Sequence, residues 1–398
     1  MEPNDQSSST RLLLLMIVAL VGLNLRPFIT GVGPLADGVS AETGLGLQGM
    51  ALLTLVPMLL MGGFAFAGPS LQVRVGARSA IIAALAILAL GSLLRLIVTT
   101  GWEMVGTAAL LGFGAAIIQA VFPGIIKRHF PRNVGIVMGL YSATLMGGGA
   151  LGAQTSPMIA DAFGGWHFGL AWLAIPALVT VALAFFHLPC DGRHVRSRNV
   201  VRTLLKRPRA WLLMACFGLV NGGYSSIVAW LAPSYQGHGW SSAASGSLLA
   251  VMAVCQAVSA LIMPALASRS DDRRPWLWLT LAMQVVGFAG LAFLPETAPL
   301  AWAAIVGAGL GGCFALSMIV ALDHLSDPAE AGALSALMQG GGFLLAAIPP
   351  WIVAVLHDLT GGFLAGWLLH LASVVVVIAL TVRLAPHTYA QAIPPMNR

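Results

Sequence analysis

The chain has 398 residues, of which 58% are hydrophobic and only 9% are charged, and its formal net charge is +6. A mean hydropathy of +0.88 excludes an ordinary soluble globular protein, because the surface of such a protein would have to be largely apolar. The basic residues gather in particular loops, so the net charge reports membrane orientation rather than nucleic-acid binding. Four cysteines, three of them in apolar segments, predict neither a disulfide framework nor a metal site.

Twelve apolar segments are each long enough to cross the roughly 30 Å hydrocarbon core of a bilayer as a helix. Of the 20 Lys and Arg residues, 18 lie at the chain ends or in the loops after even-numbered segments. Because cytoplasmic loops carry an excess of basic residues, we expect an all-α, multi-pass inner-membrane protein with both termini in the cytoplasm. The segments cover residues 11–36, 47–70, 79–99, 102–126, 133–161, 166–188, 210–235, 242–268, 275–295, 299–322, 331–356 and 361–384.

Arg26 lies near the middle of the first segment, where its guanidinium stays charged and costs about 2.5–3.5 kcal/mol to insert. All 14 acidic residues fall at segment ends or in loops, so no intramembrane carboxylate is available to pair with it. We therefore predict that Arg26 binds an anion, and that Thr30 shares its helix face. Pro27 should bend the helix at this point, and Gly22 should leave open space beside the arginine.

Polar residues also occur in the third, fourth and fifth segments. Arg95 lies near the end of the third, where we expect it to extend to the interface or to pair with Glu103. Gln119 in the fourth segment and Tyr141 in the fifth are candidate substrate ligands. The alternatives are a hydrogen bond to a neighbouring helix for Gln119 and a packing or gating role for Tyr141.

A basic stretch at residues 189–209 divides the chain into halves of six segments each, at 1–188 and 210–398. We expect this stretch to be a cytoplasmic linker near anionic lipid. The two halves repeat one another, which predicts two six-helix bundles related by a pseudo-twofold axis with a substrate site between them. An offset of 195 residues superimposes Pro69 on Pro264, Leu71 on Leu266, Arg74 on Arg269, Arg78 on Arg273, Gly112 on Gly307 and Gly114 on Gly309.

The same offset places Asn221 at the position that corresponds to Arg26, so the repeat is broken at the midplane. Because one half has a charge at the midplane and the other half has an amide, we expect the site of an asymmetric substrate at this depth of the membrane. Asn221 and Tyr224, three residues further on, are therefore candidate ligands. Gln256 in the eighth segment and Gln339 in the eleventh are further candidates, with an interhelical hydrogen bond as the alternative for each.

Two histidines lie in or beside the last segments. His324 follows Asp323 at the cytoplasmic end of the tenth segment, and the pair is a candidate gate or proton relay. The alternative is that both residues simply lie at the membrane interface, without a gating or relay role. His370 lies in the middle of the twelfth segment, where we expect a packing histidine whose hydrogen bonds are satisfied.

Motifs spread over the whole chain form a recognisable set. In the first half they are Gly22-Leu23-Asn24-Leu25-Arg26-Pro27, Val73-Arg74-Val75-Gly76-Ala77-Arg78, Ile118-Gln119-Ala120 and Met138-Gly139-Leu140-Tyr141-Ser142-Ala143. In the second half they are Asn221-Gly222-Gly223-Tyr224, Ala321-Leu322-Asp323-His324 and Met338-Gln339-Gly340.

This set resembles the cyanate permease group of the major facilitator superfamily. The loop after the second segment resembles the Asp-Arg-x-Gly-Arg stretch of facilitators, with Val73 in place of the Asp. The resemblance implies a twelve-helix transporter that works by alternating access and carries a small anion, most specifically cyanate. A sister branch of the group resembles exporters of neutral 2-nitroimidazoles, and that alternative stays open at this point.

We therefore predict a monomeric secondary active or facilitative transporter, with the lipid bilayer and a small anion as its partners. Motifs such as His-Glu-x-x-His and Gly-x-Ser-x-Gly do not occur, so we expect neither an enzyme nor a cofactor. A non-transporting membrane sensor is disfavoured because no large soluble domain is present. The predicted substrate ligands are Arg26, Asn221, Tyr224, Gln119, Tyr141, Thr30, Gln256 and Gln339.

Overall fold

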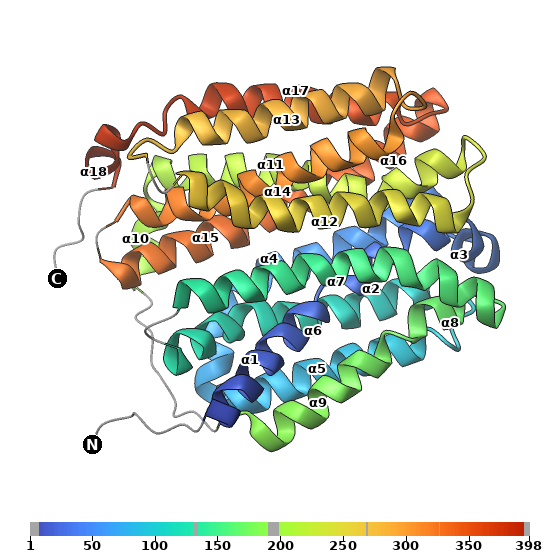
Figure 1. Ribbon diagram of the computed structural model, residues 1–398, viewed down its shortest axis with the longest axis horizontal. Helices are drawn as coiled ribbons and strands as arrows, with labels where there is room; N and C mark the ends of the chain where they lie inside the picture. The colour runs from blue at the N-terminus through green and yellow to red at the C-terminus, as the bar shows by residue number, and fades with distance from the viewer. Residues whose placement is uncertain (1–7, 131–133, 190–198, 268–269, 326, 394–398) are drawn as a thin grey trace.

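The structure is a computed structural model that describes residues 8–130, 134–189, 199–267, 270–325 and 327–393 (Figure 1). Within these ranges the fold is all-helical, and 12 helical stretches are long and apolar enough to cross a membrane. The prediction of twelve spans is confirmed. The prediction that both termini lie in the cytoplasm stays a prediction, although the start of α1 and the short α18 lie at the same end of the molecule.

The first six spans form one group of helices, drawn from blue to green in Figure 1. Two spans in this group are interrupted: the first is built from α1, α2, a 3-10 turn and α3, and the sixth from α8 and α9. The elements are α1 (Ser8–Leu23), α2 (Pro27–Thr30), η1 (Gly33–Leu35), α3 (Ala36–Thr43), α4 (Leu47–Val75), α5 (Ala77–Leu94), α6 (Gly101–His129), α7 (Val134–Phe163), α8 (Trp166–Ala171) and α9 (Ala174–His187).

The last six spans form the second group, drawn from yellow-green to red. The eleventh span is interrupted between α15 and α16. The elements are α10 (Asn199–Leu205), α11 (Pro208–Gln236), α12 (Ser242–Ala267), α13 (Arg274–Phe293), α14 (Pro299–Asp323), α15 (Pro328–Ala346), α16 (Pro349–Thr360), α17 (Leu364–Thr381), η2 (Pro386–Thr388) and α18 (Tyr389–Ala392).

The two groups meet chiefly where α7 packs against α12 and α4 against α15, and they also meet where α4 contacts α16 and where η1 contacts α11 and α12. In the basic stretch predicted to be a linker, residues 190–198 lie outside the described residues, and α10 follows them. In the facilitator-like loop, Gly76 has a φ of 85° and directly precedes α5. Only glycine adopts this conformation without strain, so the conformation explains the glycine between the two arginines of the motif.

Candidate functional site

The first span is interrupted at the residue that carries its charge. Helix α1 ends at Leu23, α2 begins at Pro27, and Arg26 is the N-cap residue of α2. Proline has no backbone N–H, so the one helical hydrogen bond that residue 27 would otherwise donate is missing here. Such an interruption is tolerated in a membrane only where the freed backbone groups are buried in protein or line a cavity. In place of the bend predicted at Pro27, the structure has a complete break between α1 and α2.

Helix α7 packs against this break through two glycines. A Cβ atom on Gly148 would lie 2.2 Å from the Leu23 carbonyl oxygen, and one on Gly152 would lie 2.5 Å from the Pro27 Cα. Only the missing side chains allow the two backbones to approach this closely. The expectation of open space beside Gly22 is wrong, because a Cβ there would lie 2.2 Å from the Thr144 hydroxyl oxygen of the same helix α7.

The Arg26 guanidinium is buried, and no carboxylate in the described part of the chain pairs with it. The residue is 6% exposed, and no acceptor among the described residues takes a hydrogen bond from it. Its Nε is buried and has no hydrogen-bond partner among the described residues. The ring of Tyr224 lies over the guanidinium, with its centroid 4.6 Å from the Arg26 Cζ. Tyr224 belongs to α11 of the second group, so this cation–π contact joins the two groups at the break.

Two further predicted residues lie beside Arg26. Tyr141 of α7 is buried against Phe122, with ring centroids 5.5 Å apart, and interacts electrostatically with Arg26. Its hydroxyl group is buried and has no hydrogen-bond partner in the described part of the chain. The Thr30 hydroxyl donates to the Gly149 carbonyl at 2.8 Å. A Cβ on Gly149 would lie 3.5 Å from the Arg26 Cβ and 3.4 Å from the Thr30 Cγ2, so both residues face the same glycine, as predicted.

The four predicted amide ligands are not joined to this cluster by any contact that the described residues show. Asn221 is buried, and its Nδ2 donates to the Phe217 carbonyl one turn earlier at 2.8 Å. Gln119, Gln256 and Gln339 make no hydrogen bond to any described residue. The interhelical bond that was the alternative for each glutamine is therefore not formed, and their role as ligands stays a prediction.

Asp323 and His324 lie at the end of α14 nearest the start of α1 and the short α18. The Asp323 carboxylate pairs with Arg273 at 3.2 Å. The His324 ring stacks on Tyr389 with centroids 3.8 Å apart, and its Nδ1 contacts the Val320 carbonyl at 2.6 Å. Burial lowers the pKa of His324 to about 4. Both residues thus make their contacts inside the second group, and a gating or relay role stays a prediction.

The expectation for Arg95 is wrong. The residue is 0% exposed and does not extend to an interface. The Glu103 carboxylate instead accepts hydrogen bonds from the backbone N–H groups of Thr99 and Thr100, at 2.9 and 3.0 Å. A glutamate three residues after a threonine N-cap is the sequence signature of a capping box, and this signal could have excluded the ion pair.

His370 is buried as expected, but its hydrogen bonds are not satisfied. The ring stacks on Phe288 with centroids 5.4 Å apart, and its Nε2 has no partner among the described residues. A Cβ on Gly223 would lie 3.7 Å from its Nδ1, so the histidine packs directly behind the Asn-Gly-Gly-Tyr stretch of α11.

Polar contacts that the sequence did not predict join the two groups far from the start of α1. The Gln236 Nε2 of α11 donates to the Pro34 carbonyl of the first group at 2.9 Å, and a bond at 2.9 Å to the Ser245 hydroxyl oxygen of its own group holds the amide in place. The Gln48 Nε2 donates to the Asp358 carboxylate at 2.9 Å. These bonds depend on how two distant parts of the chain dock, which local patterns do not encode.

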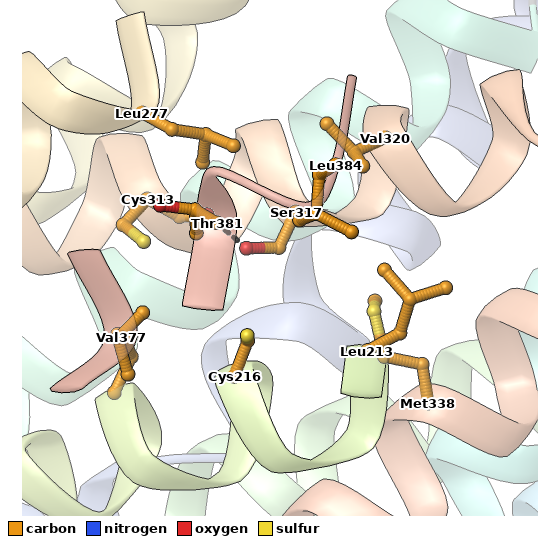
Figure 2. Close-up of a pocket in the computed structure, with 11 residues that line it drawn as sticks. Leu213, Cys216, Leu277, Cys313, Ser317, Val320, Met338, Val377, Thr381 and Leu384 are labelled. Carbon is orange, nitrogen blue, oxygen red and sulfur yellow. Dashed lines mark hydrogen bonds between the residues drawn. The ribbon is translucent and has the colours of Figure 1, made fainter. Parts of the chain in front are cut away.

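A small cavity lies within the second group, away from Arg26. Figure 2 shows Cys216 of α11 and Cys313 of α14 on its wall, together with apolar side chains such as Val377 and Leu384. The lining includes hydroxyl and sulfur atoms but no charged side chain. Such a cavity offers no counter-charge to an anion, so the cluster around Arg26 remains the candidate site.

Comparison with known proteins agrees with this architecture. Residues 12–350 match the family model described as Major Facilitator Superfamily. The chain belongs to the major facilitator superfamily. It is therefore a multi-pass membrane transporter of small molecules rather than an enzyme.

Two curated relatives cover nearly the whole chain. The chain is 43% identical to the cyanate transport protein CynX of Escherichia coli (strain K12), over 95% of this chain and 98% of that protein. It is 29% identical to the 2-nitroimidazole transporter of the same organism, over 90% of this chain and 91% of that protein.

One similar solved structure is that of a bacterial homolog of the human lysosomal transporter Spinster, in an inward-facing and unoccupied conformation. It superimposes with a TM-score of 0.76, covering 97% of both chains at 14% sequence identity. At this identity the likeness supports the fold alone.

Proposed function

We propose that the protein carries a small anion, cyanate, across the membrane, with Arg26 as the residue that binds its charge. The observation that carries the proposal is that the Arg26 guanidinium is buried and that no described residue accepts a hydrogen bond from it. Burying a charge without a partner is costly, and an anionic substrate would supply the missing partner. The similarity to CynX supports cyanate as that anion.

The groups around Arg26 match the needs of a small anion. Cyanate loses its hydration shell on entering a buried site, so binding requires several hydrogen-bond donors in its place. The Arg26 guanidinium offers charge-assisted hydrogen-bond donors. The Tyr141 hydroxyl has no partner among the described residues and offers a further donor, and Tyr141 interacts electrostatically with Arg26. The Tyr224 ring lies over the guanidinium, so an anion would approach the edge of the fork rather than this face.

The cluster also draws on both groups of helices, since Arg26 and Tyr141 belong to the first and Tyr224 to the second. A site shared by both halves lets a bound substrate influence how they rock about one another, which is the basis of alternating access. The polar bonds of Gln236 and Gln48 join the halves on one side of this site. Opening on that side would require these bonds to break.

The test is uptake of labelled cyanate into proteoliposomes that contain the wild type, Arg26→Lys or Arg26→Ala. Loss of a hydrogen-bonded charge costs about 1.5–3 kcal/mol, so the Ala variant should lose roughly 10- to 100-fold in affinity. The Lys variant should keep a weakened remnant, because it retains the charge but not the planar fork. Arg202→Gln is the matched control, since Arg202 lies exposed on α10.

Cyanate uptake by Arg26→Ala equal to that of the control would overturn the proposal. A competition assay then separates the main rival function. If the protein transports 2-nitroimidazole and cyanate at high excess does not compete, the substrate is the neutral nitroaromatic, as in the relative that is 29% identical.

A further inference from the structure

Arg95 is a second guanidinium buried among the membrane spans, and the proposed substrate contacts do not include it. The residue is 0% exposed, and no carboxylate among the described residues pairs with it. Its Nη2 is buried and has no hydrogen-bond partner within the described ranges. A charge held in this way is costly inside a membrane protein and marks a functional position.

Arg95 donates one hydrogen bond to the backbone of the interrupted first span. Beyond the break, the Gly31 N–H donates to the Pro27 carbonyl at 2.9 Å and the Val32 N–H donates to the Ile29 carbonyl at 3.3 Å. This pattern passes over the Phe28 carbonyl, which in a continuous helix would accept from Val32. The Arg95 Nη1 donates to that carbonyl at 3.2 Å. Arg95 therefore satisfies an acceptor that the interruption exposes.

The Arg95 side chain is itself held in place. Its Nε donates to the Thr107 hydroxyl oxygen at 3.4 Å, and that hydroxyl donates to the Met104 carbonyl of α6 at 2.8 Å. Because the guanidinium is planar, contacts along two of its edges fix its orientation. Arg95 thus links the start of α2 to α5 and α6. The carbonyl that it binds belongs to Phe28, two residues after Arg26.

Hydrogen bonds of Asn24 anchor the chain on the α1 side of the break. The Asn24 Nδ2 donates to the Leu20 carbonyl at 2.8 Å and to the Thr180 hydroxyl oxygen of α9 at 3.0 Å. Arg26 therefore lies between two side chains that anchor the broken segment to different neighbouring helices. The Arg26 carbonyl accepts a hydrogen bond from the Thr30 N–H at 3.2 Å, so Arg26 moves with α2, and the two anchors hold this segment against its neighbours.

We propose that Arg95 is a positioning residue for the anion site, which holds the α2 segment so that the Arg26 guanidinium is presented to the substrate. The inference rests on the proposed function, because it assumes that Arg26 binds the anion. Arg95 acts through the Phe28 carbonyl and touches no substrate.

The test is a double-mutant cycle of Arg95→Lys with Arg26→Lys. Lysine keeps the charge at position 95 but cannot make both bonds of the fork, so the variant isolates positioning from charge. We expect Arg95→Lys to raise the cyanate KM about tenfold, with the maximal rate per transporter changed by less than about twofold. The apparent cyanate Kd, measured by cyanate-dependent thermal stabilisation, should rise about tenfold with Arg95→Lys in the otherwise wild-type protein and change by less than about twofold with the same substitution in the Arg26→Lys background.

An equal effect of Arg95→Lys in both backgrounds would overturn the inference, because it would show a structural contribution independent of Arg26. So would an unchanged KM in the otherwise wild-type protein. An unchanged KM for Arg26→Lys alone would instead overturn the proposed function and the inference with it. If Arg95→Lys does not fold, Thr107→Val removes one of the bonds that hold Arg95, and the same cycle applies with a smaller effect of about threefold.

Discussion

Gly148→Ala should displace the broken first span and so disable the site without altering any proposed ligand. The added Cβ would lie 2.2 Å from the Leu23 carbonyl oxygen, and a backbone atom cannot rotate away. Reaching an ordinary contact of 3.4 Å requires the two backbones to separate by 1.2 Å, the difference between these distances. Overpacking of this kind costs about 1–3 kcal/mol, and a misplacement of about 1 Å at a reacting site can cost roughly 100-fold in rate.

The assay compares Gly148→Ala with Gly147→Ala in thermal stability and in cyanate uptake per transporter. A Cβ on Gly147 would have no atom within 4 Å, so this neighbour is a matched control with the same chemical change. The control should retain uptake, since alanine in place of glycine favours a helix by up to about 1 kcal/mol. Equal stability and uptake in the two variants would refute the close packing of α7 against Leu23.

Three further predictions test other contacts. Tyr224→Phe should retain the ring over Arg26, while Tyr224→Leu should lose about 2 kcal/mol of cation–π energy and roughly 30-fold in cyanate uptake; equal uptake by both variants would contradict this. His324 has its pKa lowered to about 4, so between pH 6.5 and 4 the unfolded chain binds a proton that the folded chain excludes, and stability falls as the pH falls. His324→Phe keeps a ring on Tyr389 and should remove this part of the pH dependence of the melting temperature; an unchanged pH profile would refute it. Gln236→Leu removes two bonds of about 1 kcal/mol each and should lengthen spin-label distances between Ser40 and Thr360 in part of the population; identical distance distributions would argue against a closing role.

The spans and a bend in the first of them could be predicted from the sequence for simple physical reasons. A bilayer requires long apolar segments, so composition alone reveals them. Pro27 removes a backbone donor, so its consequence is local and follows from its position. Arg26 could be singled out because its charge lies in the middle of an apolar segment that contains no acid.

The contacts of the site depend on three-dimensional docking and could not be predicted in the same way. Tyr224 was identified through the half-chain repeat, but its place over Arg26 depends on how the two groups meet. Arg95 was misread because its distance from a segment end says nothing about the direction of its side chain. Gly22 was misread for a related reason, since a missing side chain can leave space or can admit a neighbouring helix, and here α7 fills it.

The most direct test of the central claim is equilibrium binding of cyanate to purified protein, measured by calorimetry for the wild type, Arg26→Ala and Arg202→Gln. The proposed role of Arg26 predicts binding by the wild type and by Arg202→Gln, and a loss of roughly 10- to 100-fold in affinity for Arg26→Ala. Equal cyanate affinity in all three proteins would contradict it.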